Sequence, residues 1–492
     1  MKLSAKWTGG LVGFALSLSC ALAQTAPSPS PTPAPEPVVA PQPAVPAPAP
    51  TAAVAPAPEP TTPAAAPKPV VTPISTPSPA ASPAATTPIP IDIPVAIPPK
   101  PKKKAPPPPP PLETALSTDP NPTFQPNTFF TTAKAAERYG AIVQAGGWPT
   151  DIVALHPGAK GPAVMELRKR LSVEGDLDAT QPLTPAWDAT LTDAVKQFQS
   201  RMGLRQTGIV AGATLKAINV PAETRHTQLV ASAQRISNSS FAFGDRYVVV
   251  NLPSTSVEAI ENSKVAHRYV AIVGDPEHPS PEISAHISVI NLNPTWTLPT
   301  SIIKKEIIPK MQKDPGYLTR AKIRILDGSG KEIDPRTVNW NTNRAVNYTL
   351  RQDSGVGNSL GSIRIGMPNK LAVYMHDTPS KRLFGADYRF LSHGCVRVQG
   401  VYDYAAWLLE GTPGGPLGVW DKSSLLAEAK AAAREDIKLT KPVPVIWVYL
   451  TGWANQEGVA NFRNDVYGVD VSAEANANAD SAAQPLMPAA NP

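Results

Sequence analysis

The first quarter of the chain is dominated by proline, which limits where a folded core can form. Of the 60 prolines among 492 residues, most fall between Thr25 and Pro111, together with alanine, threonine and valine. Such a segment cannot bury a core, and its prolines remove backbone hydrogen-bond donors. We therefore predict a long disordered Pro/Ala-rich linker over residues 24–112, with the folded part beginning near Leu112.

The N-terminus has the three parts of a secretory signal. Lys2 and Lys6 supply positive charge, and the apolar stretch at 11–18 is too short to span a bilayer as a stable helix. A small-x-small cleavage site follows at Ala21-Leu22-Ala23. We predict a signal peptide over residues 1–23 and export of the mature protein.

The chain has two cysteines, Cys20 and Cys395. Cleavage after Ala23 would remove Cys20; the alternative is a lipid-modified N-terminus at Cys20, although Ser17-Leu18-Ser19 before it is a poor lipidation motif. In either case Cys395 has no evident disulfide partner. A lone thiol in an exported protein provides no cross-link, so it requires a chemical explanation.

The net charge of +6 is mild for this length. Lys100, Lys102, Lys103 and Lys104 form a basic run in the predicted linker. The run either keeps the segment soluble or attracts it to an anionic wall or membrane surface. No segment has the pattern of a nucleic-acid-binding module, so we expect no nucleic-acid partner.

Apolar residues recur at helical spacing between the linker and residue 220. A helix is expected over residues 129–145, ending in the turn Gly146-Gly147-Trp148-Pro149, within a helical scaffold segment at 113–155. Residues 156–220 predict a small module of three helices. The first two helices have apolar faces made of Val164, Leu167 and Leu171, and of Leu191, Val195, Phe198 and Met202.

After about residue 241 the pattern changes to that of β-strands. Short runs rich in valine, isoleucine and aromatic residues predict strands at 247–252, 267–273, 285–291, 362–366, 371–376 and 443–449. A mixed stretch at about 299–347, with a helix at 301–312, predicts an insertion, and a helix is expected at 401–410. We predict a multidomain α+β protein with a β-rich domain at 241–450 and a disordered tail at 471–492.

The densest group of reactive side chains joins two predicted strand ends, at His376 and at Ser392-His393-Gly394-Cys395-Val396-Arg397. A nucleophilic cysteine needs a base, an orienting group for that base and donors for an oxyanion. His376 can be the base, and N–H groups around Gly394 and Cys395 could form the oxyanion hole. A nearby imidazolium and Arg397 would lower the pKa of the thiol from about 8.5.

Each of these residues also has an ordinary interpretation. A lone cysteine is most often a small buried apolar residue, and a lone histidine a satisfied polar one. A zinc site made of His376, His393 and Cys395 lacks an evident fourth ligand. We therefore predict no metal and no cofactor, and the joint pattern favours cysteine catalysis.

The same residues carry a resemblance to a known family. Tyr374-Met375-His376 followed by Ser392-His393-Gly394-Cys395-Val396-Arg397 resembles the catalytic motif of the L,D-transpeptidases, whose catalytic domain is the YkuD domain. Three further segments resemble the large Gram-negative YcbB-type subgroup. They are Asn293-Pro294-Thr295-Trp296, Asp314-Pro315-Gly316-Tyr317 and His376-Asp377-Thr378-Pro379. Gly146-Gly147-Trp148-Pro149 also resembles that subgroup, whereas the long linker departs from it.

The three-helix module at 156–220 resembles the peptidoglycan-binding domain type 1. The resemblance rests on Gly158, Gly161, the helix around Leu167 and Leu171, Gly175-Asp176-Leu177, the helix at 194–199, Gly203-Leu204 and Thr207-Gly208. A small helical scaffold that binds nothing is the alternative.

The family resemblance implies roles for individual residues. Cys395 would attack a stem peptide of peptidoglycan at an L-to-D bond, with His376 as general base and the backbone carbonyl of Asp377 holding its ring. His393 would shape the loop, and Arg397 would anchor the loop or a substrate carboxylate. Ser392 and Asp377 would be among the substrate-binding residues. The insertion would be a capping lid. Trp296 and Tyr374 would line the cleft, although Trp296 could equally be core.

The resemblance also implies a cellular setting and an inhibitor class. It places the enzyme in the periplasm of a Gram-negative bacterium, where it would make crosslinks in the cell wall. Carbapenem-type β-lactams would be covalent inhibitors.

The motif leaves the acceptor of the acyl group open. Transfer to a second stem would make a crosslink, transfer to water would make an L,D-carboxypeptidase or a crosslink-cutting hydrolase, and transfer to a protein amine would attach an envelope protein to the wall. A third possibility is a non-catalytic wall-binding protein, against which the intact Cys, His and Arg set argues.

Overall fold

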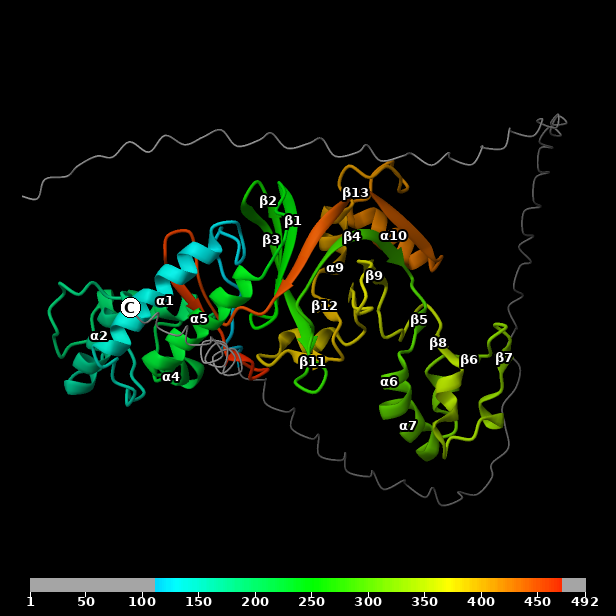
Figure 1. The fold of residues 1–492 in the computed structure, drawn as a ribbon, viewed down its shortest axis with the longest axis horizontal. Coiled ribbons are helices and arrows are strands. Elements are labelled where there is room, and N and C mark those ends of the chain that lie inside the picture. Colours follow the sequence, from blue (N-terminus) through cyan, green and yellow to red (C-terminus); the bar gives the residue numbers. More distant parts are fainter. Residues whose placement is uncertain (1–110, 471–492) are drawn as a thin grey trace, which may run out of the picture. The chain divides into compact units, whose positions relative to one another are not determined.

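The computed structural model describes residues 111–470 (Figure 1). The predicted signal peptide, the linker up to residue 110 and the tail at 471–492 lie outside the described residues. Within 111–470, no helix is both long and apolar enough to span a membrane.

Five helices form the first part of the fold. They are α1 (Thr128–Gln144), α2 (Pro162–Glu174), α3 (Ala189–Arg201), α4 (Gly212–Ile218) and α5 (Ala222–Ser237). Their apolar faces share one core, in which Leu167, Leu191 and Phe198 are fully buried. A C-terminal hairpin, β14 (Gly452–Ala454) and β15 (Ala460–Phe462), adds Phe462 to this core. The helical module therefore contains a segment from far along the chain.

The β-rich part is a nine-stranded sheet with the order β11-β3-β12-β10-β9-β4-β13-β1-β2. Because β2 also pairs with β3, the sheet closes on itself. The strands are β1 (Arg246–Asn251), β2 (Ser256–Glu261), β3 (Lys264–Gly274), β4 (Ile283–Leu292), β9 (Ile363–Gly366), β10 (Met375–His376), β11 (Phe390–Ser392), β12 (Val396–Val398) and β13 (Glu435–Val448). Its core also includes side chains of α9 (Val401–Leu408) and α10 (Lys422–Ala431).

The insertion forms a separate small subdomain with its own apolar core. Its four-stranded sheet has the order β5-β8-β6-β7 and runs from Trp296 to Gln352, slightly beyond the predicted 299–347. The strands are β5 (Trp296–Thr297), β6 (Ile323–Leu326), β7 (Glu332–Ile333) and β8 (Thr349–Gln352). A helical stretch, α6 (Thr300–Ile302), the π-helical turn η1 (Ile303–Ile307) and α7 (Ile308–Lys313), precedes α8 (Tyr317–Arg320). The 3-10 turns η2 (Pro335–Thr337) and η3 (Asn343–Asn347) complete it, and η4 (Lys381–Gly385) lies outside it.

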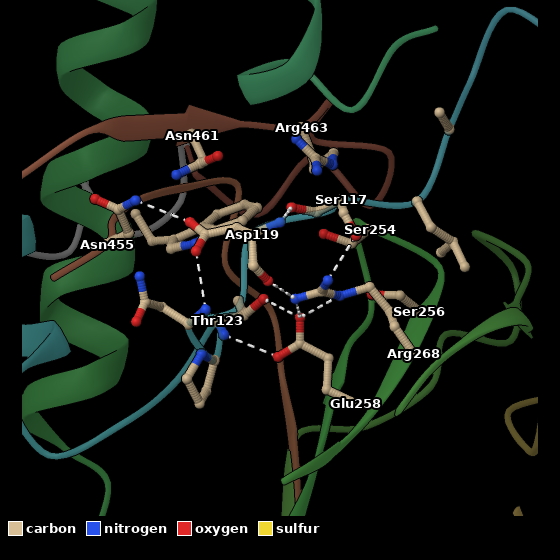
Figure 2. A pocket seen from close by; sticks show the side chains of 15 residues that line it. Ser117, Asp119, Thr123, Ser254, Ser256, Glu258, Arg268, Asn455, Asn461 and Arg463 are labelled. Carbon is tan, nitrogen blue, oxygen red and sulfur yellow. Dashed lines mark hydrogen bonds and ion pairs between the residues drawn. The ribbon is translucent and has the colours of Figure 1, made fainter. Parts of the chain in front are cut away.

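The segment before α1 is attached to the closed sheet by a charged network (Figure 2). Glu258 of β2 accepts hydrogen bonds from the N–H and hydroxyl of Thr123, at 2.8 and 2.9 Å. Arg268 of β3 pairs with Glu258 at 3.0 Å and donates to the carbonyl of Asp119 at 3.0 Å. The ion pair of Glu258 and Arg268 therefore holds the segment before α1 against β2 and β3.

The strand predicted at 371–376 is mostly wrong, because only Met375 and His376 pair with neighbouring strands. The Asn369 side chain explains the difference. Its amide donates to the carbonyls of Met367 and Val373 and accepts from the N–H of Leu371. These local bonds replace a strand ladder and hold residues 369–373 as a loop.

Candidate active site

His376 and Cys395 lie on neighbouring strands of the closed sheet. β10 pairs in parallel with β12, with Met375 opposite Val396 and His376 opposite Arg397. Met375 and Val396 are fully buried in the core. Since side chains alternate across a strand, His376 and Arg397 share the other face. Cys395 directly precedes Val396, so by the same alternation its side chain is expected on the face that carries His376 and Arg397.

His376 is 5% exposed, and its Nδ1 bonds the backbone carbonyl of Asp377 at 2.5 Å. A carbonyl can only accept, so Nδ1 carries the proton and the lone pair is on Nε2. Burial, and then the charge of Arg397, lower the pKa of His376 to about 3. The imidazole is therefore neutral at neutral pH and has the tautomer that a general base needs.

The expected low thiol pKa is not found. Burial raises the pKa of Cys395, and it outweighs a hydrogen bond with the backbone of Tyr374 and the charges of Arg364 and Arg397. Because His376 is neutral, no imidazolium stabilises a thiolate. The resting pair is a neutral thiol and a neutral imidazole, so proton transfer must accompany attack on a substrate.

Tyr374, which the family resemblance implies is a cleft residue, interacts with the thiol of Cys395. Its pKa is raised, first by burial and second by Cys395, and it has side-chain hydrogen bonds with Trp296 and Cys395. The guanidinium of Arg364 lies 4.4 Å from the Tyr374 ring centroid and donates to Asn291 at 2.8 Å. Sequence reasoning missed Arg364, whose only signal is a cation at a half-buried position of β9.

The loop before β12 is held by its own hydrogen bonds. The Ser392 hydroxyl donates to the carbonyl of Cys395 at 2.5 Å and accepts from the N–H of Gly394 at 3.3 Å. Ser280 donates to the carbonyl of Gly394 at 2.8 Å. The Gly394 N–H thus has a protein partner in this structure, and a substrate oxyanion would have to compete with Ser392 for it.

Gly394 has φ +103°, a conformation that L side chains rarely adopt. A Cβ there would meet nothing closer than 3.7 Å, so the cost of a side chain comes from the backbone and not from a clash. We expect Gly394→Ala to lower the free energy of unfolding by about 1–2 kcal/mol. Urea unfolding measures this change; Gly328→Ala, in the insertion with neither positive φ nor a close neighbour, is the control and should change it far less.

His393 points toward the inserted subdomain. Its Nε2 lies 3.1 Å from the Glu306 carboxylate, and its ring is 4.5 Å from that of His278. Glu306 and Lys305, which contacts His278 at 2.8 Å, both belong to the π-helical turn η1. Such turns are rare and frequently found at functional sites. The insertion therefore contacts the loop that carries Cys395, a link not visible in the sequence.

Asp377 and Arg397 border the site in different ways. The Asp377 carboxylate is buried and accepts from the N–H of Ser362 at 3.1 Å and from Lys381. Arg397 is half-buried, its pKa is lowered by burial, and the charges of Cys395 and Glu306 oppose that shift. Arg397 could therefore bind a substrate carboxylate.

The structure brings eight of the nine predicted site residues together around β10 and the start of β12, and it adds Trp296 from the insertion. Trp296 is half-buried, packs against the core of the inserted subdomain, and bonds Tyr374. It therefore contacts both the subdomain core and the site. Within 111–470 no group of three or more His, Cys, Asp or Glu side chains is arranged to hold a metal ion.

The buried neutral imidazole gives a pH-dependent stability. Its folded pKa of about 3 lies below the ordinary 6.5, so the unfolded chain binds the proton first as the pH falls. The contribution is complete above about pH 6.5 and is lost as the pH falls toward 3. We expect wild type to lose up to about 4–5 kcal/mol relative to His376→Asn across this range. Urea unfolding at several pH values measures it; parallel stability curves of the two proteins would contradict the assignment.

Comparison with known proteins agrees with this geometry. Residues 245–414 match the family model described as "L,D-transpeptidase catalytic domain". The chain contains an L,D-transpeptidase catalytic domain. Residues 160–218 match the model described as "Putative peptidoglycan binding domain", which covers α2, α3 and α4.

Relatives of the L,D-transpeptidase domain are found among curated proteins and solved structures. A Haemophilus influenzae protein named "Putative L,D-transpeptidase" is 31% identical over 227 residues, 45% of this chain and 44% of that protein. The chain thus spans less than half the length of this relative.

Three solved structures are also similar. An L,D-transpeptidase from Xylanimonas cellulosilytica has TM-score 0.21 and 14% identity, covering 60% of this chain and 97% of that one. One from Mycobacterium smegmatis has TM-score 0.20 and 14% identity, covering 42% and 58%. The E. faecium catalytic domain acylated by ertapenem has TM-score 0.21 and 12% identity, covering 42% and 99%.

Proposed function

We propose that this protein is an L,D-transpeptidase that forms a thioacyl-enzyme on Cys395 and transfers the acyl group to an amine, crosslinking peptidoglycan. The observation that carries the proposal is the pairing of β10 with β12 inside a matched L,D-transpeptidase domain. His376, whose imidazole is neutral with its free lone pair on Nε2, is on the strand next to the one that Cys395 directly precedes, and this arrangement supports the proposal.

The first half-reaction begins when the Cys395 sulfur attacks the carbonyl of an L-to-D bond in a donor stem peptide. The thiol proton passes to Nε2 of His376, which becomes an imidazolium held by the Asp377 carbonyl. When the C–N bond breaks, that proton passes to the leaving amine. The products are a thioester on Cys395, a released D-amino acid and a neutral His376 again.

The second half-reaction reverses these roles. An acceptor amine attacks the thioester carbonyl, and Nε2 of His376 takes a proton from the attacking nitrogen. The C–S bond breaks, and the sulfur recovers a proton from the imidazolium. A new amide joins two stems, and Cys395 returns to the neutral thiol that burial favours.

Positive charge around the thiol supports a substrate with carboxylates. Arg364 and Arg397 both act electrostatically on Cys395, and they favour an anionic ligand in a site from which water is partly excluded. Trp296 and Tyr374 would line the cleft for the stem, and the contact between His393 and Glu306 would couple the inserted subdomain to the reactive loop. Membership of the YcbB-type subgroup remains part of this proposal.

The cellular setting is also proposed. The N-terminal pattern at 1–23 supports export to the periplasm of a Gram-negative bacterium, and the helical module at 156–220 would hold the enzyme on the wall. Carbapenem-type β-lactams would acylate Cys395 in place of the stem. A mass adduct with such a compound on wild type, absent from Cys395→Ala, is the expected result.

Product analysis tests the proposed transfer and separates it from the alternatives. The mature protein is incubated with tetrapeptide-bearing muropeptides, and products are followed by mass spectrometry. New dimers indicate transfer between stems, whereas shortened stems without dimers indicate hydrolysis, and an added protein amine tests attachment of an envelope protein. Identical product profiles from wild type and Cys395→Ala would overturn all three enzymatic functions.

A further inference from the structure

A charged cavity lies between the helical module and the closed sheet. Its volume is about 370 Å³, within the usual size range of small-ligand sites. Met202, Phe390 and Phe462 supply part of an apolar wall. None of the nine residues predicted for the cysteine site lines it, and so it is a different site.

Three arginines line this cavity, and each donates only to neutral acceptors. Arg225 bonds the side-chain oxygen of Gln228 and the carbonyl of Ala217, both at 3.0 Å. Arg389 bonds the Thr255 hydroxyl at 3.0 Å and the Ala386 carbonyl at 2.7 Å.

Arg463 completes the set and donates to the carbonyl of Arg201 at 3.0 Å. Within residues 111–470, no salt bridge joins any of the three to a carboxylate, whereas the neighbouring Arg268 has Glu258. Figure 2 shows Arg463 and that pair among the residues that line a neighbouring pocket.

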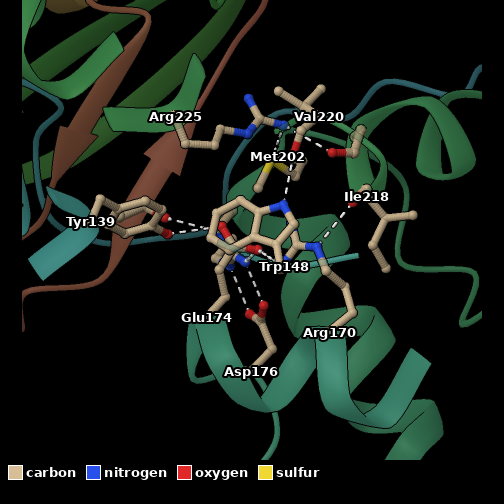
Figure 3. Close-up of polar contacts among 12 residues, drawn as sticks. Tyr139, Trp148, Arg170, Glu174, Asp176, Met202, Ile218, Val220 and Arg225 are labelled. Carbon is tan, nitrogen blue, oxygen red and sulfur yellow. Dashed lines mark hydrogen bonds and ion pairs between the residues drawn. The ribbon is translucent and has the colours of Figure 1, made fainter. Parts of the chain in front are cut away.

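Because these arginines are largely buried, the lack of a salt bridge to any of them costs free energy. Arg225 is 3% exposed and Arg389 6%, and the Nε of Arg225 has no hydrogen-bond partner among the described residues. Burial lowers the pKa of Arg225 and of Arg463 to about 10, and it also lowers that of Arg389. A buried cation without a paired anion is unfavourable, and an incoming carboxylate would relieve that cost. Figure 3 shows Arg225 beside Met202 and Val220, which also line the cavity.

The backbone and the remaining charges around the cavity also favour an anion. Gly203 has φ +69°, and a Cβ there would lie 2.5 Å from Cζ of Arg463, so glycine leaves room for that guanidinium. Asp387 lines the cavity and acts electrostatically on Arg389 without forming a salt bridge with it, and its carboxylate accepts from the N–H groups of Glu113 and Thr114, at 3.0 and 2.8 Å. Lys216, an exposed residue, adds a fourth cation at the cavity.

From this arrangement we infer that the cavity is a second binding site for a peptide carboxylate, occupied by a stem peptide of peptidoglycan. The carboxylate would bind the arginines, and the short peptide body would lie on Met202, Phe390 and Phe462. The choice of a stem peptide rests on the proposed function, whereas the anion site rests on the arginines alone. Arg389 directly precedes β11, which ends at Ser392, so the site is continuous in sequence with the reactive loop.

Titration calorimetry on the full chain tests the inference. Cys395→Ala removes turnover, and the titrants are a tetrapeptide stem with free carboxylates, the same peptide with amidated carboxylates, and inorganic phosphate. We expect Cys395→Ala to bind the stem at two sites. In Cys395→Ala with Arg389→Gln, the affinity of the second site should be about ten- to a hundredfold weaker. Arg389→Lys should restore part of that affinity. Arg434→Gln, an exposed arginine outside the cavity, is the matched control and should keep both sites.

Lys216→Gln keeps the test open if Arg389→Gln does not fold. Lys216 is exposed, so its loss does not empty the core, and we expect a severalfold weaker second site. A single stem site on Cys395→Ala would overturn the inference. A second site whose affinity is unchanged by Arg389→Gln and by Lys216→Gln would also overturn it. Binding of phosphate or the amidated peptide as tight as that of the free stem would overturn the peptide-carboxylate assignment. Because binding is measured without turnover, dimer formation by wild type can fail or succeed independently of this result.

Discussion

Replacing His376 with asparagine is expected to slow thioacylation of Cys395 by about 10²–10⁴-fold. The reason is that both resting groups are neutral, so the thiol must lose its proton during attack, and Nε2 of His376 is the base that we propose takes it. Asparagine can keep a hydrogen bond to the Asp377 carbonyl but cannot accept that proton as a base. Stopped-flow or time-resolved mass spectrometry with an acylating substrate measures the rate.

His393→Asn is the matched control for this prediction. His393 lies in the same loop, but its side chain is 36% exposed and pairs with Glu306. A partly exposed ion pair contributes little energy, so we expect His393→Asn to change the acylation rate by less than about tenfold. Equal losses in the two variants would show that the loop needs histidines for its shape and that His376 is not the base.

Arg201→Met is expected to lower the free energy of unfolding by about 3–5 kcal/mol. Arg201 is 5% exposed and pairs with Glu174 at 2.6 Å and with Asp176. Figure 3 shows these two carboxylates. Glu174 also accepts from Tyr139 at 2.8 Å and pairs with Arg170 at 2.7 Å. Methionine fills much of the same volume but carries no charge. Asp176 would then be buried without its cation, and Glu174 would keep only Arg170 as an ion-pair partner.

Urea unfolding of the full chain measures this loss. Lys196→Met on the same helix is the control, because Lys196 and Asp193 form an exposed pair at 3.6 Å. We expect that substitution to change the free energy of unfolding by less than about 1 kcal/mol. If the two substitutions cost the same, the buried network does not stabilise the helical module as described. Arg201→Met with Asp176→Asn should recover part of the loss, because it removes the carboxylate that Arg201→Met leaves without a cation.

Local patterns in the sequence predicted most of the regular elements. Alternating or continuous apolar runs placed β1, β3, β4 and β9 within a few residues, because those strands are set by burial in one core. α5 was not predicted, since it buries polar residues such as Arg225, Gln228 and Ser232 and therefore lacks a simple apolar face. The hairpin β14–β15 was missed for a different reason: its core partners are helices more than 200 residues earlier.

Some residues of the candidate site could be predicted from the sequence, and others could not. Cys395 and His376 could be proposed as nucleophile and base because the residues around each lie together in the sequence and resemble a known motif. Arg364 and Glu306 come from β9 and from the insertion, and only the folded chain brings them to the loop. The thiol pKa was predicted in the wrong direction because charge could be read from the sequence, whereas the burial that outweighs it could not.

Intact-protein mass spectrometry of the enzyme with a tetrapeptide donor tests the central claim most directly. We predict that wild type gains the mass of the donor minus its terminal D-amino acid, that hydroxylamine removes the adduct as expected of a thioester, and that peptide mapping places it on Cys395. Cys395→Ala should gain no mass. An adduct of the same mass on Cys395→Ala, or none on wild type while stems are still processed, would contradict the account.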